Sequence, residues 1–119
     1  MKVYTSKDEF DGVLVEKHVP TIKLPSDAKA GQEFEIEVIV GDKFPHPNLV
    51  EHHIEWIRIF AEIDGANFSP VQLAYVEFEP VVTAPRVKIK VKLEKSANII
   101  AQSFCNLHGL WEDSSRIRL

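Results

Sequence analysis

The chain of 119 residues contains one cysteine, Cys105, and one methionine, Met1. A single cysteine cannot form an internal disulfide, so the disulfide-stapled class of small secreted domains is excluded. No stretch approaches the roughly 20 consecutive apolar residues of a transmembrane helix. The N-terminal residues lack the apolar core of a signal peptide. We therefore predict a cytoplasmic protein with no membrane association, folded as a single domain over residues 1–119.

The sequence has no surplus of basic residues either. The 14 Lys and Arg residues against 18 Asp and Glu residues give a formal net charge of −4. This balance argues against a nucleic-acid-binding surface, which needs clustered cations to displace counterions. The four basic residues between Arg86 and Lys92 alternate with apolar residues, which is typical of the solvent-facing side of a strand.

Long helical periodicity is also missing, and alternation with a period of two takes its place. Residues 33–41 and 86–94 alternate apolar with charged side chains, which predicts half-buried antiparallel strands. Further β-rich apolar runs occupy residues 53–65, 71–80, 97–105 and 115–119, and another strand is expected within 12–25. Proline residues fall at the ends of these runs, where a missing N–H costs no ladder bond. The pattern predicts an all-β fold, an immunoglobulin-like antiparallel β-sandwich of about seven strands.

The residues that carry chemistry are Cys105 and the histidines. Cys105 and His108 have C-x2-H spacing in the stretch SFCNLHGLW. Thiolate and imidazole are ligands for borderline metals, and a two-residue gap lets both converge from one turn. Taken alone, this motif fits a buried free thiol beside a surface histidine better. The other four histidines are His18, His46, His52 and His53.

Three further features favour a metal site. His46 stands between Pro45 and Pro47, which restrict its backbone and lower the entropy cost of holding its imidazole. A glycine follows His108 and permits a tight or left-handed turn. His52 and His53 are neighbours, so on a strand they would point to opposite faces and at most one would reach the same centre. The pattern alone does not distinguish between them, because both faces of the following strand are apolar.

The donor set narrows the choice of metal. A blue-copper centre usually needs an axial methionine after the cysteine, and the chain has only Met1. A structural zinc site usually has several cysteines. Four imidazoles with one thiolate leave a coordination position open, which suits a redox iron that must bind a small molecule.

Three segments together resemble the signatures of the superoxide reductase family, which includes the neelaredoxins and the iron-binding domain of desulfoferrodoxin. These segments are EKHVP at 16–20, HPNLVEHHIEWI at 46–57 and CNLHGLW at 105–111. They occur in the family order, and the resemblance spans essentially the whole chain. It implies one-electron reduction of superoxide to hydrogen peroxide, without release of oxygen, as a defence against oxidative stress in an anaerobe.

The resemblance also implies a set of functional residues. One iron per chain, cycling between Fe²⁺ and Fe³⁺, would be held by His18, His46, His52, Cys105 and His108, with His53 left outside. Glu16 would be the sixth ligand of the ferric state, and Lys17 would attract superoxide and help to deliver a proton through water. The family suggests rubredoxin as the electron donor and a homotetramer as the assembly.

Two other classes of protein are compatible with a metal-binding sandwich. A non-catalytic electron carrier would need neither an open coordination position nor the lysine of EKH. A metal-stabilised interaction domain would use the same ligands for folding alone.

Overall fold

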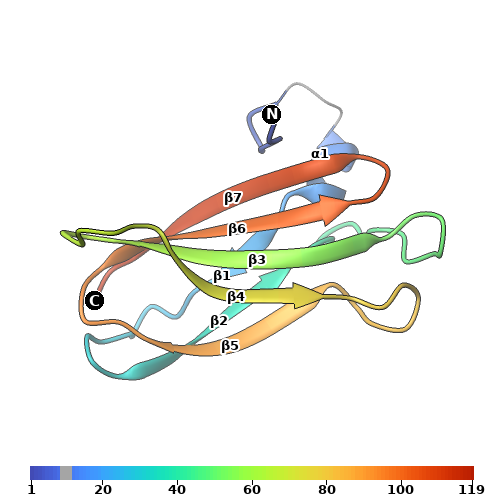
Figure 1. Ribbon diagram of the computed structural model, residues 1–119. Helices are drawn as coiled ribbons and strands as arrows, with labels where there is room; N and C mark the ends of the chain where they lie inside the picture. The colour runs from blue at the N-terminus through green and yellow to red at the C-terminus, as the bar shows by residue number, and fades with distance from the viewer. Residues whose placement is uncertain (9–11) are drawn as a thin grey trace.

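The computed structural model describes residues 1–8 and 12–119 of the chain, and these form seven strands and one short helix. Their bounds are α1 Gly12–His18, β1 Thr21–Lys23, β2 Glu33–Ile39, β3 Ile54–Ile63, β4 Val71–Glu77, β5 Arg86–Lys92, β6 Ala97–Cys105 and β7 Gly109–Ile117. One sheet has the order β1-β2-β5 and the other β4-β3-β6-β7, and the named strand pairs are all antiparallel. The two sheets lie face to face as layers (Figure 1). The predicted all-β sandwich is confirmed.

The alternating sequences build the core between the sheets. In β2, Phe34, Ile36 and Val38 are buried, whereas Glu33 and Glu35 are exposed. Their partners in β5 follow the same rule, because Val38 lies opposite the buried Val87. The facing layer contributes side chains with no exposed area, which are Ile57, Ile59, Ala61, Ala97, Ile99 and Ala101. Burial of these apolar side chains supplies the main stabilisation of such a sandwich.

The strand expected within residues 12–25 is confirmed as β1, and a helix that the pattern did not predict precedes it. Within residues 12–25 the chain first forms helix α1 and then the short strand β1. Lys17 and His18 occupy the last turn of the helix, where positive charge is favourable to the helix dipole. Pro20 follows, and the residue before a proline disfavours helical geometry, so the helix ends there.

The last strand begins earlier than predicted. The expected strand at 115–119 is observed as β7, Gly109–Ile117. Trp111 and Ile117 are buried, but Asp113 and Ser115 between them share the same parity and line a pocket. Polar residues at inward positions hide the alternation, so the sequence pattern shows only the end of the strand.

The two ends of the sandwich differ in what they carry. The site end comprises α1 and the connections 40–53, 78–85 and 106–108, which meet at the right of Figure 1. The far end comprises the connections 24–32, 64–70 and 93–96. In the described part of the chain, no helix is long and apolar enough to cross a membrane.

Candidate metal centre

Donor atoms from several segments converge at the site end. One ligand atom from each of His18, His52, Cys105 and His108 lies within 4.8 Å of all the others. His46 joins this group, because its Nε2 lies 3.1 Å from Nε2 of His18 and 3.4 Å from Sγ of Cys105. The resemblance implied six ligands. The structure brings five of them together, and the sixth, Glu16, is not among them.

The four imidazole rings form a closed cycle. Consecutive ring centroids are 4.6 Å apart for His18 and His46, 4.7 Å for His46 and His52, 5.0 Å for His52 and His108, and 4.8 Å for His108 and His18. Neighbouring rings meet edge to face, whereas His18 and His52 face each other across the cycle at 6.4 Å. Sγ of Cys105 lies 3.7 Å from Nδ1 of His108 and completes the group. This arrangement presents four nitrogens and one sulfur to a common centre.

Hydrogen bonds on the outer side of two rings fix which nitrogen faces the centre. Nδ1–H of His18 donates to the carbonyl of Leu14 at 2.8 Å, and Nδ1–H of His46 donates to the carbonyl of Pro47 at 2.6 Å. Such outer partners orient metal-binding histidines and set their tautomer. Nε2 of both rings is therefore free for a metal. His108 is turned the other way, with Nδ1 lying 3.1 Å from Nε2 of His18.

His52 provides an independent test of whether the site fits a metal. Its Nε2 is buried, and it has no hydrogen-bond partner among the described residues. A buried polar atom without a partner is costly, and native structures rarely keep one without a reason. A cation at the centre of the cycle would satisfy this atom, so the donor set fits a bound metal.

Burial favours the neutral form of three of the imidazoles, which is the form that can bind a metal. Removal from water lowers the pKa of His18 and of His46 to about 4, and the pKa of His52 is lowered chiefly for the same reason. Charges on the neighbouring rings act in the same direction. Neutral imidazoles at physiological pH leave their lone pairs available to a metal.

The sulfur of Cys105 is enclosed and hydrogen-bonded. Cys105 has no exposed area, and burial raises the pKa of its thiol above the ordinary value of 9.0. The backbone N–H groups of Leu107 and His108 donate to the sulfur and act in the opposite direction. Gly109 then turns the chain into β7 with a φ of 84°, as the sequence predicted for this position.

Two contacts hold His18 against the larger sheet. Oγ of the buried Ser103 donates to the carbonyl of His18 at 3.0 Å. Trp111 stacks on the imidazole with centroids 5.0 Å apart, and its Nε1–H donates to the carbonyl of His108 at 3.1 Å. Trp111 is thus both a core residue and a wall of the site. Its closeness to Cys105 and His108 in the sequence predicts the second of these roles.

Asn106 connects the cysteine turn to the segment that carries His52. Its Oδ1 accepts from the N–H of His53 at 2.9 Å, and its Nδ2–H donates to the carbonyl of Glu51 at 2.9 Å. Nδ1–H of His53 donates to the carbonyl of Leu49 at 3.0 Å, so His53 lies outside the ligand cycle. The asparagine within C-N-x-H was the signal available for this link.

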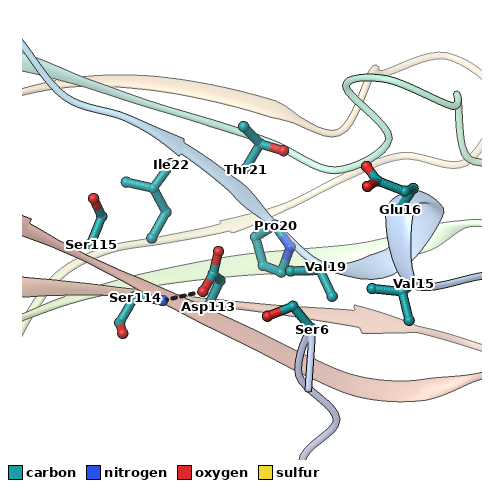
Figure 2. A pocket seen from close by; sticks show the side chains of 10 residues that line it. All are labelled: Ser6, Val15, Glu16, Val19, Pro20, Thr21, Ile22, Asp113, Ser114 and Ser115. Atoms are coloured by element: carbon teal, nitrogen blue, oxygen red, sulfur yellow. Dashed lines mark hydrogen bonds between the residues drawn. The ribbon is translucent and has the colours of Figure 1, made fainter. Parts of the chain in front are cut away.

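Lys17 and Glu16 occupy different surroundings. Lys17 is half-buried and precedes His18 in the last turn of α1, and its positive charge acts to lower the pKa of His18 and His52. Glu16 is about 200° from His18 around the helix axis, because each residue turns an α-helix by about 100°. Its side chain is exposed and lines a pocket of about 290 Å³ between α1, β1 and β7 (Figure 2). Glu16 is not among the converging groups, and its role as a ligand stays a prediction.

Comparison with known proteins identifies the family to which the chain belongs. The desulfoferrodoxin family model matches residues 12–114. The chain belongs to the desulfoferrodoxin family. Among family members, the superoxide reductase of Pyrococcus horikoshii is 39% identical over 105 residues, covering 86% of this chain and 88% of that protein. The neelaredoxin of Megalodesulfovibrio gigas is 36% identical over 116 residues, covering 87% of this chain and 88% of that protein.

Solved structures of the desulfoferrodoxin family have the same fold. The superoxide reductase (neelaredoxin) from Ignicoccus hospitalis superimposes with a TM-score of 0.89 at 41% identity, covering 98% of this chain and 94% of that chain. The superoxide reductase from Nanoarchaeum equitans superimposes with a TM-score of 0.81 at 30% identity, covering 98% of this chain and all of that chain (100%). The resemblance found in the three sequence segments is confirmed.

Proposed function

We propose that this chain is a superoxide reductase that reduces superoxide by one electron to hydrogen peroxide at a mononuclear non-haem iron. The observation that carries the proposal is the closed cycle of four imidazoles with the sulfur of Cys105 beside it. Membership of the desulfoferrodoxin family supports iron as the metal. We further propose that the 119-residue chain is a single domain that binds one iron.

The residues that would hold the iron are His18, His46, His52, Cys105 and His108. When bound, the iron supplies the electron that superoxide accepts and is later re-reduced by a donor. The thiolate of Cys105 would favour the ferric state, and the N–H groups of Leu107 and His108 would moderate its electron donation. Cys105 and the two N–H groups would thereby set how readily the bound iron gives up its electron.

Lys17 is proposed to guide the substrate. The protein as a whole is anionic, with a formal net charge of −4. Attraction of superoxide therefore needs a local positive charge, and Lys17 is the residue next to the proposed ligand His18 in the last turn of α1. Its ammonium group can hold a water molecule that delivers a proton to the departing peroxide.

Glu16 is proposed as the sixth ligand of the ferric state, as the family resemblance implies. His18 and Glu16 lie on opposite faces of α1, so this binding would require the last turns of the helix to reorganise. The electron donor is proposed to be rubredoxin, the assembly a homotetramer and the compartment the cytoplasm. The donor and the assembly rest on the family alone, and the compartment rests on the single cysteine and the N-terminal sequence.

Product yields from a pulse of superoxide test the proposed function. Reduction consumes one electron and two protons per superoxide and yields one hydrogen peroxide with no oxygen. Dismutation yields half as much peroxide and releases oxygen. With reduced, iron-loaded protein we expect the first stoichiometry. Oxygen release in the dismutase ratio, or a colourless zinc protein after iron-replete expression, would contradict the proposal.

Replacement of Lys17 tests the guiding role. We expect Lys17→Ala to slow the reaction with superoxide about tenfold at low ionic strength, the lower end of the range for electrostatic steering, with unchanged iron content. Pulse radiolysis measures the rate. Lys95→Ala, at the far end, is a matched control because it lowers the net charge from −4 to −5 in the same way. Equal slowing in both variants, or loss of iron from Lys17→Ala, would refute the role.

A further inference from the structure

The segment that carries two of the five donors is not held by a sheet. This segment, residues 46–53, is called the ligand loop here, and it lies between the end of β2 at Ile39 and the start of β3 at Ile54. In the described part of the chain, its backbone hydrogen bonds are a pair between Leu49 and His52, with N···O distances of 2.8 and 3.1 Å, and one at its last residue, from the N–H of Asn106 to the carbonyl of His53 at 3.2 Å. The position of the earlier part of the loop therefore depends mainly on side-chain contacts with its surroundings.

Asn48 provides such a contact at the centre of the ligand loop. Its Oδ1 accepts from the backbone N–H of Val81 at 2.7 Å. Its Nδ2 donates to the carbonyls of Thr83 at 3.2 Å and Val81 at 3.4 Å. One side-chain amide thus joins the ligand loop to the connection 78–85, which links β4 in one sheet to β5 in the other.

Val81, the main partner of Asn48, has an unusual backbone. Its φ is 70°, and it is the one non-glycine residue with positive φ in the described part of the chain. A β-branched residue rarely adopts this conformation, and such strain persists only where the surroundings impose it. The side chain of Val81 is 55% exposed, so burial does not impose it. Asn48 engages both the N–H and the carbonyl of this residue.

We propose that Asn48 is a positioning residue that fixes the ligand loop, and with it His46 and His52, before the metal binds. Asn48 stands two residues after His46 and four before His52, whose rings are adjacent in the cycle at 4.7 Å. The ring of His46 donates to the carbonyl of Pro47, the residue next to Asn48. A loop anchored at this point loses less conformational freedom when the metal binds, which raises affinity. The inference rests on the metal site of the proposed function and is independent of superoxide chemistry.

The rate of iron release to excess chelator tests the proposal. We expect Asn48→Ala to release iron about tenfold faster than the wild type, within the range found for outer partners of metal ligands. The visible thiolate-to-iron absorption band should also broaden, because His46 and His52 would sample more positions. Asn98→Ala is the matched control, since Nδ2 of Asn98 donates to Oε1 of Glu62 at 3.2 Å away from the metal centre. Release from Asn48→Ala at the wild-type rate, or equal acceleration in the control, would overturn the proposal.

Two further variants keep the proposal testable if Asn48→Ala does not fold. Asn48→Asp keeps the acceptor for the N–H of Val81 and loses both donated hydrogen bonds. Its rate of iron release should therefore lie between that of the wild type and that of a variant without any of the three hydrogen bonds. Val81→Gly keeps both backbone groups and tolerates positive φ, so it should release iron at the wild-type rate. Wild-type release from Asn48→Asp would overturn the proposal, as would fast release from Val81→Gly.

The outcome is separable from that of the proposed function. If the wild-type protein binds iron but does not reduce superoxide, the proposed function fails while the release rates still decide the role of Asn48. If the protein binds zinc instead, zinc release to a chelator gives the same test.

Discussion

The two ends of the sandwich use polar residues in opposite ways. At the site end, two histidines kept neutral by burial are almost inaccessible, with His18 1% and His46 8% exposed. At the far end, polar side chains meet in solvent, where Arg116 pairs with Asp64 and also donates to Asn98. The same two sheets support both arrangements.

This difference shows which polar contacts fix the positions of side chains and which do not. Buried polar groups are costly unless they are satisfied, so each contact at the site end constrains the position of a ligand. Exposed ion pairs contribute little to stability, because water and salt screen them. Substitutions at the site end should therefore affect metal binding, whereas those at the far end should change only stability.

The largest effect is expected from the sulfur of the metal centre. Cys105→Ser is nearly isosteric but replaces the thiolate with a hydroxyl, so the visible thiolate-to-iron absorption should disappear. Iron release should accelerate by more than about 100-fold, since even outer partners of metal ligands are worth 10- to 100-fold. Absorption spectroscopy and chelator competition measure both. A retained visible band would show that Cys105 is not a ligand.

A pair of glycines compares the two ends directly. Gly41 and Gly65 both have positive φ, of 82° and 71°. Alanine at either should cost about 1–2 kcal/mol of folding free energy from backbone strain. At Gly41 the added Cβ would also lie 2.4 Å from the backbone N of His46, whereas at Gly65 its nearest neighbour is Nζ of Lys95 at 3.6 Å.

We therefore expect Gly41→Ala to be the less stable variant in urea unfolding and to lose iron, while Gly65→Ala keeps its iron. Iron content after gel filtration measures the difference. Full iron retention in Gly41→Ala would mean that the loop before His46 can move without harm to the site.

The smallest effect is expected from the exposed pair at the far end. Asp64→Asn removes the charge partner of Arg116 and should shift the urea midpoint less than Gly65→Ala does, with no change in iron content. The guanidinium of Arg116 lowers the pKa of Asp64 below 3.8. The contribution of the pair is therefore full above pH 3.8 and is lost as the pH falls through the lower folded value. A loss of iron from this variant would contradict the expectation that substitutions at the far end leave metal binding unchanged.

The sequence was most informative where one face of a strand is uniformly apolar. The alternation around Phe34, Ile36 and Val38 predicted β2, and the alternation over residues 86–94 predicted β5, because the inward positions of both are apolar. The same reasoning missed the start of β7, where Asp113 and Ser115 take inward positions beside a pocket.

The choice between His52 and His53 shows a different limit. Counting alternate residues back along the strand could not decide between them, because β3 begins only at Ile54 and its register shifts between Ile54 and Trp56. The structure turns His52 into the cycle and hydrogen-bonds His53 to Leu49. Family resemblance supplied what the alternation could not. The roles of Asn48 and Gly41 depend on how loops pack together, which periodicity does not encode.

The order of the donors along the chain also bears on how the protein matures. His18 and His108 lie at opposite ends of the sequence, yet their nitrogens are 3.1 Å apart. They meet only after strands from both halves of the chain have paired, which is the slow, non-local part of β-sheet folding. Among the described residues, the apolar core cluster includes Cys105 and none of the four histidines of the cycle, so its burial does not depend on them. We therefore expect metal binding to follow strand pairing, so that protein produced without metal still folds into the two-sheet sandwich.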